Sequence, residues 1–248
     1  MSSETYRIAR YLARAGVTSR RKSEEIIRAG RVCVNGEVTV NLASQIDPER
    51  DVVTVDGTPV VLEEREVTLA TYKKRGILVS RGDDRGRRTV FDELPVDYAL
   101  VADRLVYAGR LDYTSEGLLL LSTDGDLVNA LTHPSRHVEK EYRVTAEREL
   151  TSAELESLRG GVLLDGLRTL PCRVERVPGK DKPIYRLVIR EGKNRQIRRM
   201  FEAVGNNVNR LIRVRVGPVE LKRLSPGEWR ELSREEIAKL RASTEKSL

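Results

Sequence analysis

The feature that most constrains the fold is a short apolar block within a chain of 248 residues, 33% of which are charged. Leu118 to Leu121 is the longest strongly apolar run, and the turn residues Asp124 and Gly125 follow it. A run this short, bounded by turn residues, indicates a buried strand. It is far below the roughly 20 residues that a membrane-spanning helix needs. We therefore expect a globular core and no membrane association.

The cysteines and the first residues indicate the compartment. Cys33 and Cys172 have no metal-binding spacing and imply no disulfide framework. Met1 to Thr5 lacks the apolar core of a signal peptide. We expect a cytoplasmic protein with reduced thiols.

The distribution of positive charge predicts the class of partner. The chain has 45 Lys and Arg against 38 Asp and Glu, a formal net charge of +7. Of the 45 cations 35 are Arg, whose planar fork suits phosphate. A net charge of +7 alone fits a solvated Arg-rich surface equally well. Residues 1–36 carry +5 and residues 190–215 carry +6, however, so the remainder carries −4. This clustering favours an anionic polymer as the partner.

The N-terminal segment predicts two short helices followed by a small sheet. Apolar residues recur at helical spacing over residues 5–16. A second helix is expected over residues 18–28, with Ser19 as a candidate cap. In residues 31–38, apolar and other residues alternate on both sides of Asn35-Gly36, a pattern typical of a hairpin.

The segments Leu12–Lys22 and Ile26–Gly36 resemble the RNA-binding module named after ribosomal protein S-four. The resemblance covers roughly residues 5–64, and a generic helix pair with a hairpin is the alternative. A cluster of cations lies at the start of the second helix, where backbone N–H groups also attract phosphate. The residues expected to bind RNA in this module are Arg20, Arg21, Lys22, Arg28 and Arg31.

A larger domain is expected to begin near Val67 with an apolar strand that Lys73 to Gly76 interrupts. Strands and helices alternate after it without internal repeats, which favours a mixed α+β class. We expect an N-terminal module over residues 1–64, a larger domain over 65–236, and a C-terminal tail over 237–248 that frays at its polar end.

The most informative stretch for chemistry runs from Gly109 to Gly125. It places Arg110 and Asp112 two positions apart in a Gly-bounded segment directly before the apolar strand. A carboxylate beside a buried strand is partly desolvated and needs a cationic partner to remain ionised. Considered without the neighbouring motifs, an Asp in an ordinary turn would be the more frequent explanation.

This stretch resembles the signature of the RsuA/RluB branch of the pseudouridine synthases. In that signature Gly-Arg-Leu-Asp is followed by a small residue, a glycine, four apolar residues and a Ser or Thr, and residues 109–122 fit every fixed position. The resemblance implies that Asp112 is the catalytic residue and that Arg110 binds substrate. It also implies an α+β pseudouridine synthase domain with a mainly antiparallel sheet.

Two further segments match the same family in the right order. Lys140-Glu141-Tyr142 resembles a Lys-x-Tyr motif whose Tyr packs against the target base, although Tyr142 alone would pass for an ordinary strand aromatic. In residues 191–200 the resemblance implies that Arg198 forms an ion pair with the catalytic Asp, and Leu211 is implied to wall the base pocket. The cations expected to bind RNA here are Lys193, Arg195 and Arg199.

Three positions depart from the usual family pattern. Lys74 stands where the family often has Pro, which affects the local turn, and Ser115 replaces the commoner Thr. Glu116 adds a negative charge four residues after Asp112, where it could tune the site without touching it.

The histidines do not predict a metal site. His133 and His137 have an i, i+4 spacing, but Pro134 lies between them and no third ligand is nearby, so a structural or RNA-facing role is expected. No phosphate-binding loop or dinucleotide fingerprint is present. We expect neither a metal nor another cofactor.

The resemblance implies isomerisation of a uridine already in RNA to pseudouridine. The segment Leu12–Arg21 is most similar to RluB members, which modify large-subunit ribosomal RNA. That RNA, free or in a pre-ribosomal particle, is the expected partner of a monomeric enzyme. A small-subunit rRNA synthase, a non-catalytic ribosome assembly factor and a DNA-binding regulator are the alternatives. Asp112 is expected to act as nucleophile or base.

Overall fold

The structure, a computed structural model, describes residues 5–62, 66–222 and 224–245. The chain divides into two units, which are described separately. The first contains the chain up to Val67 together with two short excursions, Val96–Val106 and Ser122–Gly125. The second contains Thr68–Pro95, Tyr107–Leu121 and the chain from Asp126 onward.

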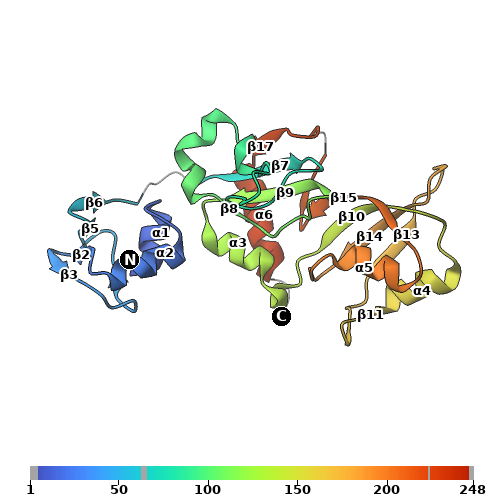
Figure 1. Ribbon diagram of the computed structural model, residues 1–248, viewed down its shortest axis with the longest axis horizontal. Coiled ribbons are helices and arrows are strands. Elements are labelled where there is room, and N and C mark those ends of the chain that lie inside the picture. Colours follow the sequence, from blue (N-terminus) through green and yellow to red (C-terminus); the bar gives the residue numbers. More distant parts are fainter. Residues whose placement is uncertain (1–4, 63–65, 223, 246–248) are drawn as a thin grey trace. The chain divides into compact units, whose positions relative to one another are not determined.

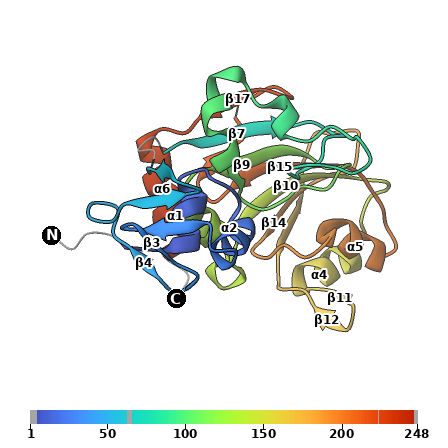
Figure 2. The same cartoon turned by 60° about the vertical axis from the view of Figure 1, so that its left-hand side comes forward.

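The two expected N-terminal helices are present. Helix α1 (Ile8–Arg14) packs on α2 (Arg20–Arg28), as Figure 2 shows. Ser19 caps α2, because its Oγ accepts a hydrogen bond of 3.4 Å from the Lys22 N–H. The first helix begins later than expected, since β1 (Tyr6–Arg7) precedes it and pairs with β4 (Gln45–Ile46).

The N-terminal sheet contains the predicted hairpin. Its strands, in spatial order, are β3 (Glu37–Val38), β2 (Val32–Val34), β5 (Val53–Val55) and β6 (Thr58–Val60). Asn35 and Gly36 join β2 to β3 with φ values of 52° and 87°. These positive values at both turn residues match the twist of the flanking strands. Ile8, Leu12 and Ile27 are fully buried in the core under this sheet.

The second unit contains one large, mainly antiparallel sheet, as expected. Its main strands, in spatial order, are β13 (Arg173–Arg176), β14 (Ile184–Ile189), β10 (Lys140–Ala146), β15 (Val208–Val216), β9 (Glu116–Ser122), β7 (Thr68–Lys73) and β17 (Trp229–Glu231), and Figure 1 labels them. Two short strands join it, β16 (Val219–Glu220) beside β15 and β8 (Val106–Tyr107) beside β9. The pairs from β13 through β15 are antiparallel, whereas β9 runs parallel to β15.

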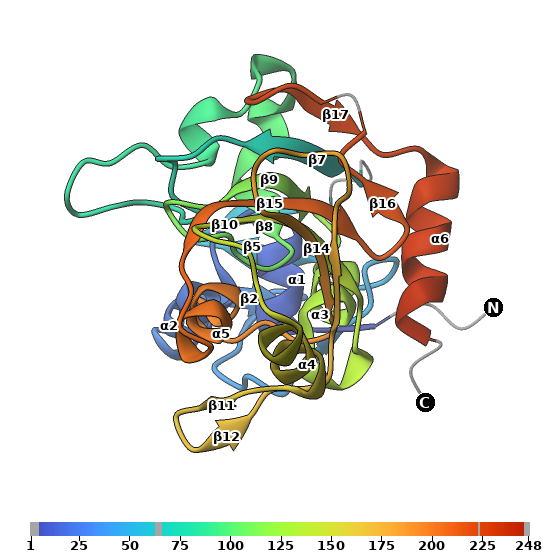
Figure 3. The same cartoon turned by 90° about the vertical axis from the view of Figure 1, so that its right-hand side faces the viewer.

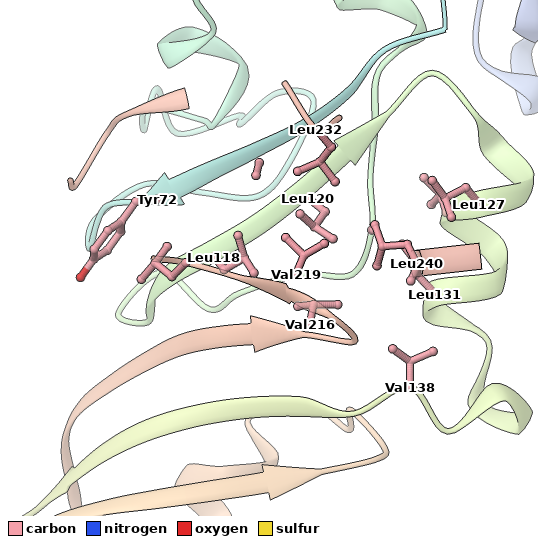
Figure 4. Packing of buried hydrophobic residues seen from close by; sticks show 14 of the residues in the cluster. Tyr72, Leu118, Leu120, Leu127, Leu131, Val138, Val216, Val219, Leu232 and Leu240 are labelled. Atoms are coloured by element: carbon pink, nitrogen blue, oxygen red, sulfur yellow. The ribbon is translucent and has the colours of Figure 1, made fainter. Parts of the chain in front are cut away.

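The apolar block lies in β9, which is buried along its whole length. Two helices, α3 (Gly125–Thr132) and α6 (Arg234–Glu245), pack their apolar residues on the same core. Figure 4 shows Leu131 of α3 next to Leu240 of α6, and Figure 3 shows α6 alongside β16. All four leucines are buried, and Leu118 and Leu120 belong to the core on which α3 and α6 pack.

The C-terminal tail expected over residues 237–248 is not a separate tail. Leu240 is fully buried and Ile237 packs against the core, so the amphipathic segment belongs to α6, which continues to Glu245. Burial of the apolar stripe stabilises this helix, whereas its polar C-terminal end alone would not keep it folded. The last residues, 246–248, lie outside the described part of the chain.

The remaining helices cover the sheet near β13 and β14. Helix α4 (Ser152–Gly160) contacts β13, and α5 (Gln196–Ala203) contacts the hairpin of β11 (Leu163–Leu164) and β12 (Leu167–Arg168). Phe201 of α5 meets Tyr185 of β14 edge to face, with ring centroids 6.3 Å apart. Three 3₁₀ segments complete the described elements: η1 (Phe91–Glu93), η2 (Val96–Arg104) and η3 (Pro134–Arg136).

Candidate active site

A cavity of about 320 Å³ brings together four of the five residues predicted for catalysis and substrate binding, all except Arg198. Asp112 reaches it from the loop between β8 and β9, Tyr142 from β10 and Leu211 from β15. Tyr142 and Leu211 are 8% and 5% exposed, so each offers a packed apolar surface to the cavity. Three of the predicted cations, Arg110, Lys193 and Arg195, also line it.

Lys73 is hydrogen-bonded to the loop that carries Asp112. The sequence predicted only that this lysine interrupts a strand. The Lys73 ammonium donates hydrogen bonds to the carbonyl oxygens of Lys74 (3.0 Å), Asp112 (3.2 Å) and Ser115 (2.7 Å). Its side chain is 1% exposed. Burial lowers the pKa of Lys73 to about 8, against the opposing influence of the Asp112 and Glu116 charges. The three carbonyls occupy all three donors, so Lys73 fixes the loop.

Arg198 does not make the predicted direct ion pair with Asp112. Arg198 belongs to α5 and does not line the cavity, and its guanidinium donates instead to the carbonyl oxygens of Val208 (2.8 Å) and Thr114 (3.3 Å). Among the described residues no carboxylate lies within 4.0 Å of it. Burial lowers the pKa of Arg198, the charge of Arg195 lowers it further, and the charge of Asp112 opposes both. Arg198 therefore interacts with Asp112 electrostatically at longer range, and it donates a hydrogen bond to the Thr114 carbonyl of the same loop.

Glu116 is neutralised away from the cavity. The Arg210 guanidinium donates to its two carboxylate oxygens at 2.8 and 2.9 Å, and the Tyr72 hydroxyl donates at 3.2 Å. This paired hydrogen bonding lowers the pKa of Glu116, although burial opposes it. Glu116 is not among the residues that line the cavity. Its charge is thus compensated by Arg210 and does not reach the cavity directly.

The sequence patterns assign no role to two more cavity residues: Lys140, which they mark only as part of the Lys-x-Tyr motif, and Arg213. Lys140 lines the cavity, and burial together with the charge of Arg213 lowers its pKa to about 8. Arg213, 2% exposed, donates from Nε to the Leu118 carbonyl at 2.7 Å. Strand alternation provides a signal for both, since Lys140 is two residues from Tyr142 and Arg213 is two residues from Leu211.

The cations predicted to bind RNA fall into two groups. Arg20, Arg21 and Lys22 are exposed at the start of α2, and none has an ion-pair partner in the described part of the chain. Among the others, Arg28 pairs with Glu24 (3.5 Å), Arg31 with Asp56 (2.5 Å), Lys193 with Glu191 (3.6 Å) and Arg199 with Asp165 (2.5 Å), whereas Arg195 lines the cavity and forms no ion pair in the described part of the chain. The first group is therefore the freer to meet phosphate.

The histidines act locally. His133 lines the cavity, and its Nδ1 accepts from the Ser135 N–H at the start of η3. His137 ends η3 in a left-handed conformation. Within residues 5–62, 66–222 and 224–245, no group of three His, Cys, Asp or Glu side chains is placed to hold a metal ion. The helices of those same ranges include none long and apolar enough to cross a bilayer.

A cavity lined by a carboxylate on a clamped loop, an aromatic and an apolar side chain, and several Arg and Lys is the arrangement expected of an enzyme that acts on a base of a nucleic acid. The sequence profile described as "RNA pseudouridylate synthase" matches residues 67–203, and that of the "S4 domain" matches residues 7–52. The chain belongs to the RNA pseudouridylate synthase family and carries an N-terminal S4 domain. It is accordingly an isomerase, as the resemblance implied.

Individual relatives are similar to this chain over nearly its whole length. It is similar to ribosomal large subunit pseudouridine synthase B of Vibrio cholerae, with 43% identity over 96% of this chain and 75% of the relative. It is also similar to the Bacillus subtilis protein of the same name, with 38% identity over 95% and 96% of the two chains. A crystal structure of a pseudouridylate synthase superposes with a TM-score of 0.68 at 32% identity, over 94% of this chain and 99% of that one.

Proposed function

We propose that the enzyme converts a uridine of large-subunit ribosomal RNA into pseudouridine, with Asp112 as the catalytic group. The observation that carries this assignment is the single cavity that Asp112 shares with Tyr142 and Leu211. The relatives in Vibrio cholerae and Bacillus subtilis, described as acting on the large ribosomal subunit, support the choice of target.

The proposed reaction balances within the substrate. The bond between C1′ and N1 of uracil breaks, the uracil turns, and C1′ bonds to C5; C5 loses a proton and N1 gains one. Asp112 acts at the sugar, either as a nucleophile at C1′ or as a base at C2′, as carboxylates do in glycoside chemistry. Because C1′ is reached only when the nucleotide leaves its stack, unpaired uridines are the favoured substrates.

The cavity walls suit the detached uracil. Tyr142 and Leu211 supply flat apolar surface for the ring, and Arg110 offers a cation at the mouth of the same cavity. Arg198 stabilises the Asp112 loop through the Thr114 carbonyl and adds positive potential near the carboxylate. In this proposal the carboxylate acts on the sugar, the apolar walls hold the base, and the cations supply positive charge beside both.

Replacing Arg198 with Ala is expected to lower kcat by about 100-fold or more, a size typical of a lost electrostatic contact at the reacting centre. Binding of RNA should change much less, since Arg198 is 9% exposed. Single-turnover rates and RNA titration measure the two quantities. Arg199→Ala, on the next residue of α5, is the matched control and should weaken binding more than turnover. An Arg198→Ala variant with normal kcat would contradict the role.

The N-terminal module is proposed to dock the phosphate backbone. Substituting both Arg20 and Arg21 with Ala should weaken RNA binding and reduce the slope of log K against log salt by about two, one per lost phosphate contact. The turnover rate at saturating RNA should equal that of the wild type. Titrations at several salt concentrations, with structured RNA and duplex DNA compared at matched salt, measure this. An unchanged slope would remove these residues from the RNA interface, and preference for duplex DNA would favour the regulator alternative.

The target is tested by mapping pseudouridines in ribosomal RNA from cells with and without the gene. We expect a large-subunit position to lose its modification and to regain it with the wild-type gene only. Loss at a small-subunit position would assign the alternative target. Loss at no position would favour a non-catalytic assembly factor.

We further propose a monomeric cytoplasmic enzyme that meets its RNA either free or in a pre-ribosomal particle. Comparing turnover on a naked transcript with turnover on isolated particles identifies the substrate form. Sedimentation of the enzyme at working concentration tests the monomer.

A further inference from the structure

The proposed reaction needs a group that accepts the C5 proton. Once C1′ has bonded to C5, this carbon carries both the sugar and its hydrogen, and the C5–H bond must break before the uracil ring regains its double bond. Asp112 is again a free carboxylate at that point, but its proposed place is at the sugar. A proton acceptor beside the base would therefore complete the reaction.

Lys140 is placed for this role by the strand that carries it. It precedes Tyr142 by two residues on β10, so both side chains point to the same face of the sheet. Both line the cavity with Asp112. Tyr142 is the expected wall for the uracil ring, which brings the Lys140 amine beside the base rather than beside the sugar.

The Lys140 amine is held but not neutralised. Its Nζ donates one hydrogen bond, to the Val138 carbonyl at 3.2 Å, which leaves two of its three positions available. No carboxylate forms an ion pair with it in the part of the chain that the structure describes. Lys73 differs on both counts, because three carbonyls occupy its donors and it does not line the cavity.

The surroundings of Lys140 favour the free amine. Burial, and then the positive charge of Arg213 on the neighbouring strand β15, lower its pKa to about 8. An amine poised near the operating pH is an effective general base. The other titratable or charged side chains that line this cavity are Arg110, Asp112, His133, Tyr142, Arg190, Glu191, Lys193, Arg195 and Arg213.

We propose that Lys140 is the general base that removes the proton from C5, an inference that rests on the proposed function of this cavity. The neutral amine takes the proton, and the C5–H electron pair becomes the C5=C6 double bond. The C6=N1 pair moves onto N1, which takes a proton from solvent. The resulting ammonium then returns its proton to solvent, so the cycle closes without another reactant.

The test uses RNA with either hydrogen or deuterium at C5 of the target uridine, with Lys140→Met and Lys140→Arg compared with the wild type. Both variants should lose about 100-fold in kcat, within the usual contribution of a general base. Both should also turn over the deuterated RNA more slowly than the protiated RNA, by a larger ratio than the wild type, because proton removal becomes rate-limiting. Arg retains the charge but does not deprotonate, so it should not rescue.

Several outcomes would overturn the inference. Recovery of kcat in Lys140→Arg would assign Lys140 a purely electrostatic role, and an isotope ratio unchanged in both variants would remove it from the proton step. A raised ratio in Tyr142→Phe alone would move the base to Tyr142. Lys193→Met, in the same cavity, is the matched control and should weaken RNA binding without raising the ratio.

Folding and function are separated by two further measurements. Thermal unfolding checks each variant, and Lys140→Gln replaces Lys140→Met if the latter unfolds. Wild-type enzyme that forms no pseudouridine would refute the proposed function itself, whereas active wild-type enzyme with unaffected Lys140 variants would refute only the role of Lys140.

Discussion

Replacement of Asp112 with Asn is expected to abolish pseudouridine formation while RNA binding persists. The amide has nearly the same size as the carboxylate, so the cavity that Asp112 shares with Tyr142 should keep its shape. It has no negative charge to attack C1′ or to take a proton at C2′. Loss of such a group lowers turnover by about 10⁴-fold or more in enzymes that depend on one side chain for bond making. Pseudouridine in the product RNA and the affinity for unreacted RNA measure the two effects.

The matched control changes the same functional group at a distant position. Asp181 is exposed in the turn between β13 and β14 and does not line the cavity. Asp181→Asn should therefore retain wild-type turnover. Measurable turnover by Asp112→Asn above the level of an enzyme-free reaction would refute the catalytic assignment, and weakened RNA binding in this variant alone would place Asp112 in recognition rather than chemistry.

Contiguous patterns in the sequence predicted the parts of the molecule that local rules determine. Asn35-Gly36 indicated a hairpin because few residue pairs adopt positive φ at both turn positions, and the structure has that turn. The run from Gly109 to Ser122 predicted a loop followed by a buried strand. Its family resemblance led to the class of enzyme before any contact was known.

Contacts distant in sequence could not be predicted in the same way. Lys73 clamps carbonyls 39 and 42 residues further along the chain, so no local pattern distinguishes it from a surface lysine. Arg198 was expected to touch Asp112, but the Val208 and Thr114 carbonyls hold its guanidinium instead. The helix predicted over residues 5–16 begins only at Ile8, because Tyr6 pairs with Ile46 in a short sheet. In each case the deciding partner comes from another strand or loop.

The junction of β9 with β15 is expected to be highly sensitive to a small substitution. Gly117 lies opposite Arg213 in this parallel pair and has a φ of 106°. A Cβ at this position would lie 2.3 Å from the Arg213 carbonyl oxygen and 2.7 Å from its nitrogen. Gly117→Ala should lower the free energy of unfolding by about 4 kcal/mol or more, because neither the strain nor the backbone clash can be relieved by a rotamer change.

The same substitution should also affect activity in whatever fraction remains folded. Separation of β9 from β15 would move the Asp112 loop, which directly precedes β9, away from Leu211 on β15. Urea unfolding and turnover at low temperature measure the two effects. Gly125→Ala is the matched control, since nothing lies within 4 Å of a Cβ there and the residue begins α3, where Ala is the better helix former. Equal stabilities of the two variants would contradict the view that the approach of β15 requires glycine at position 117.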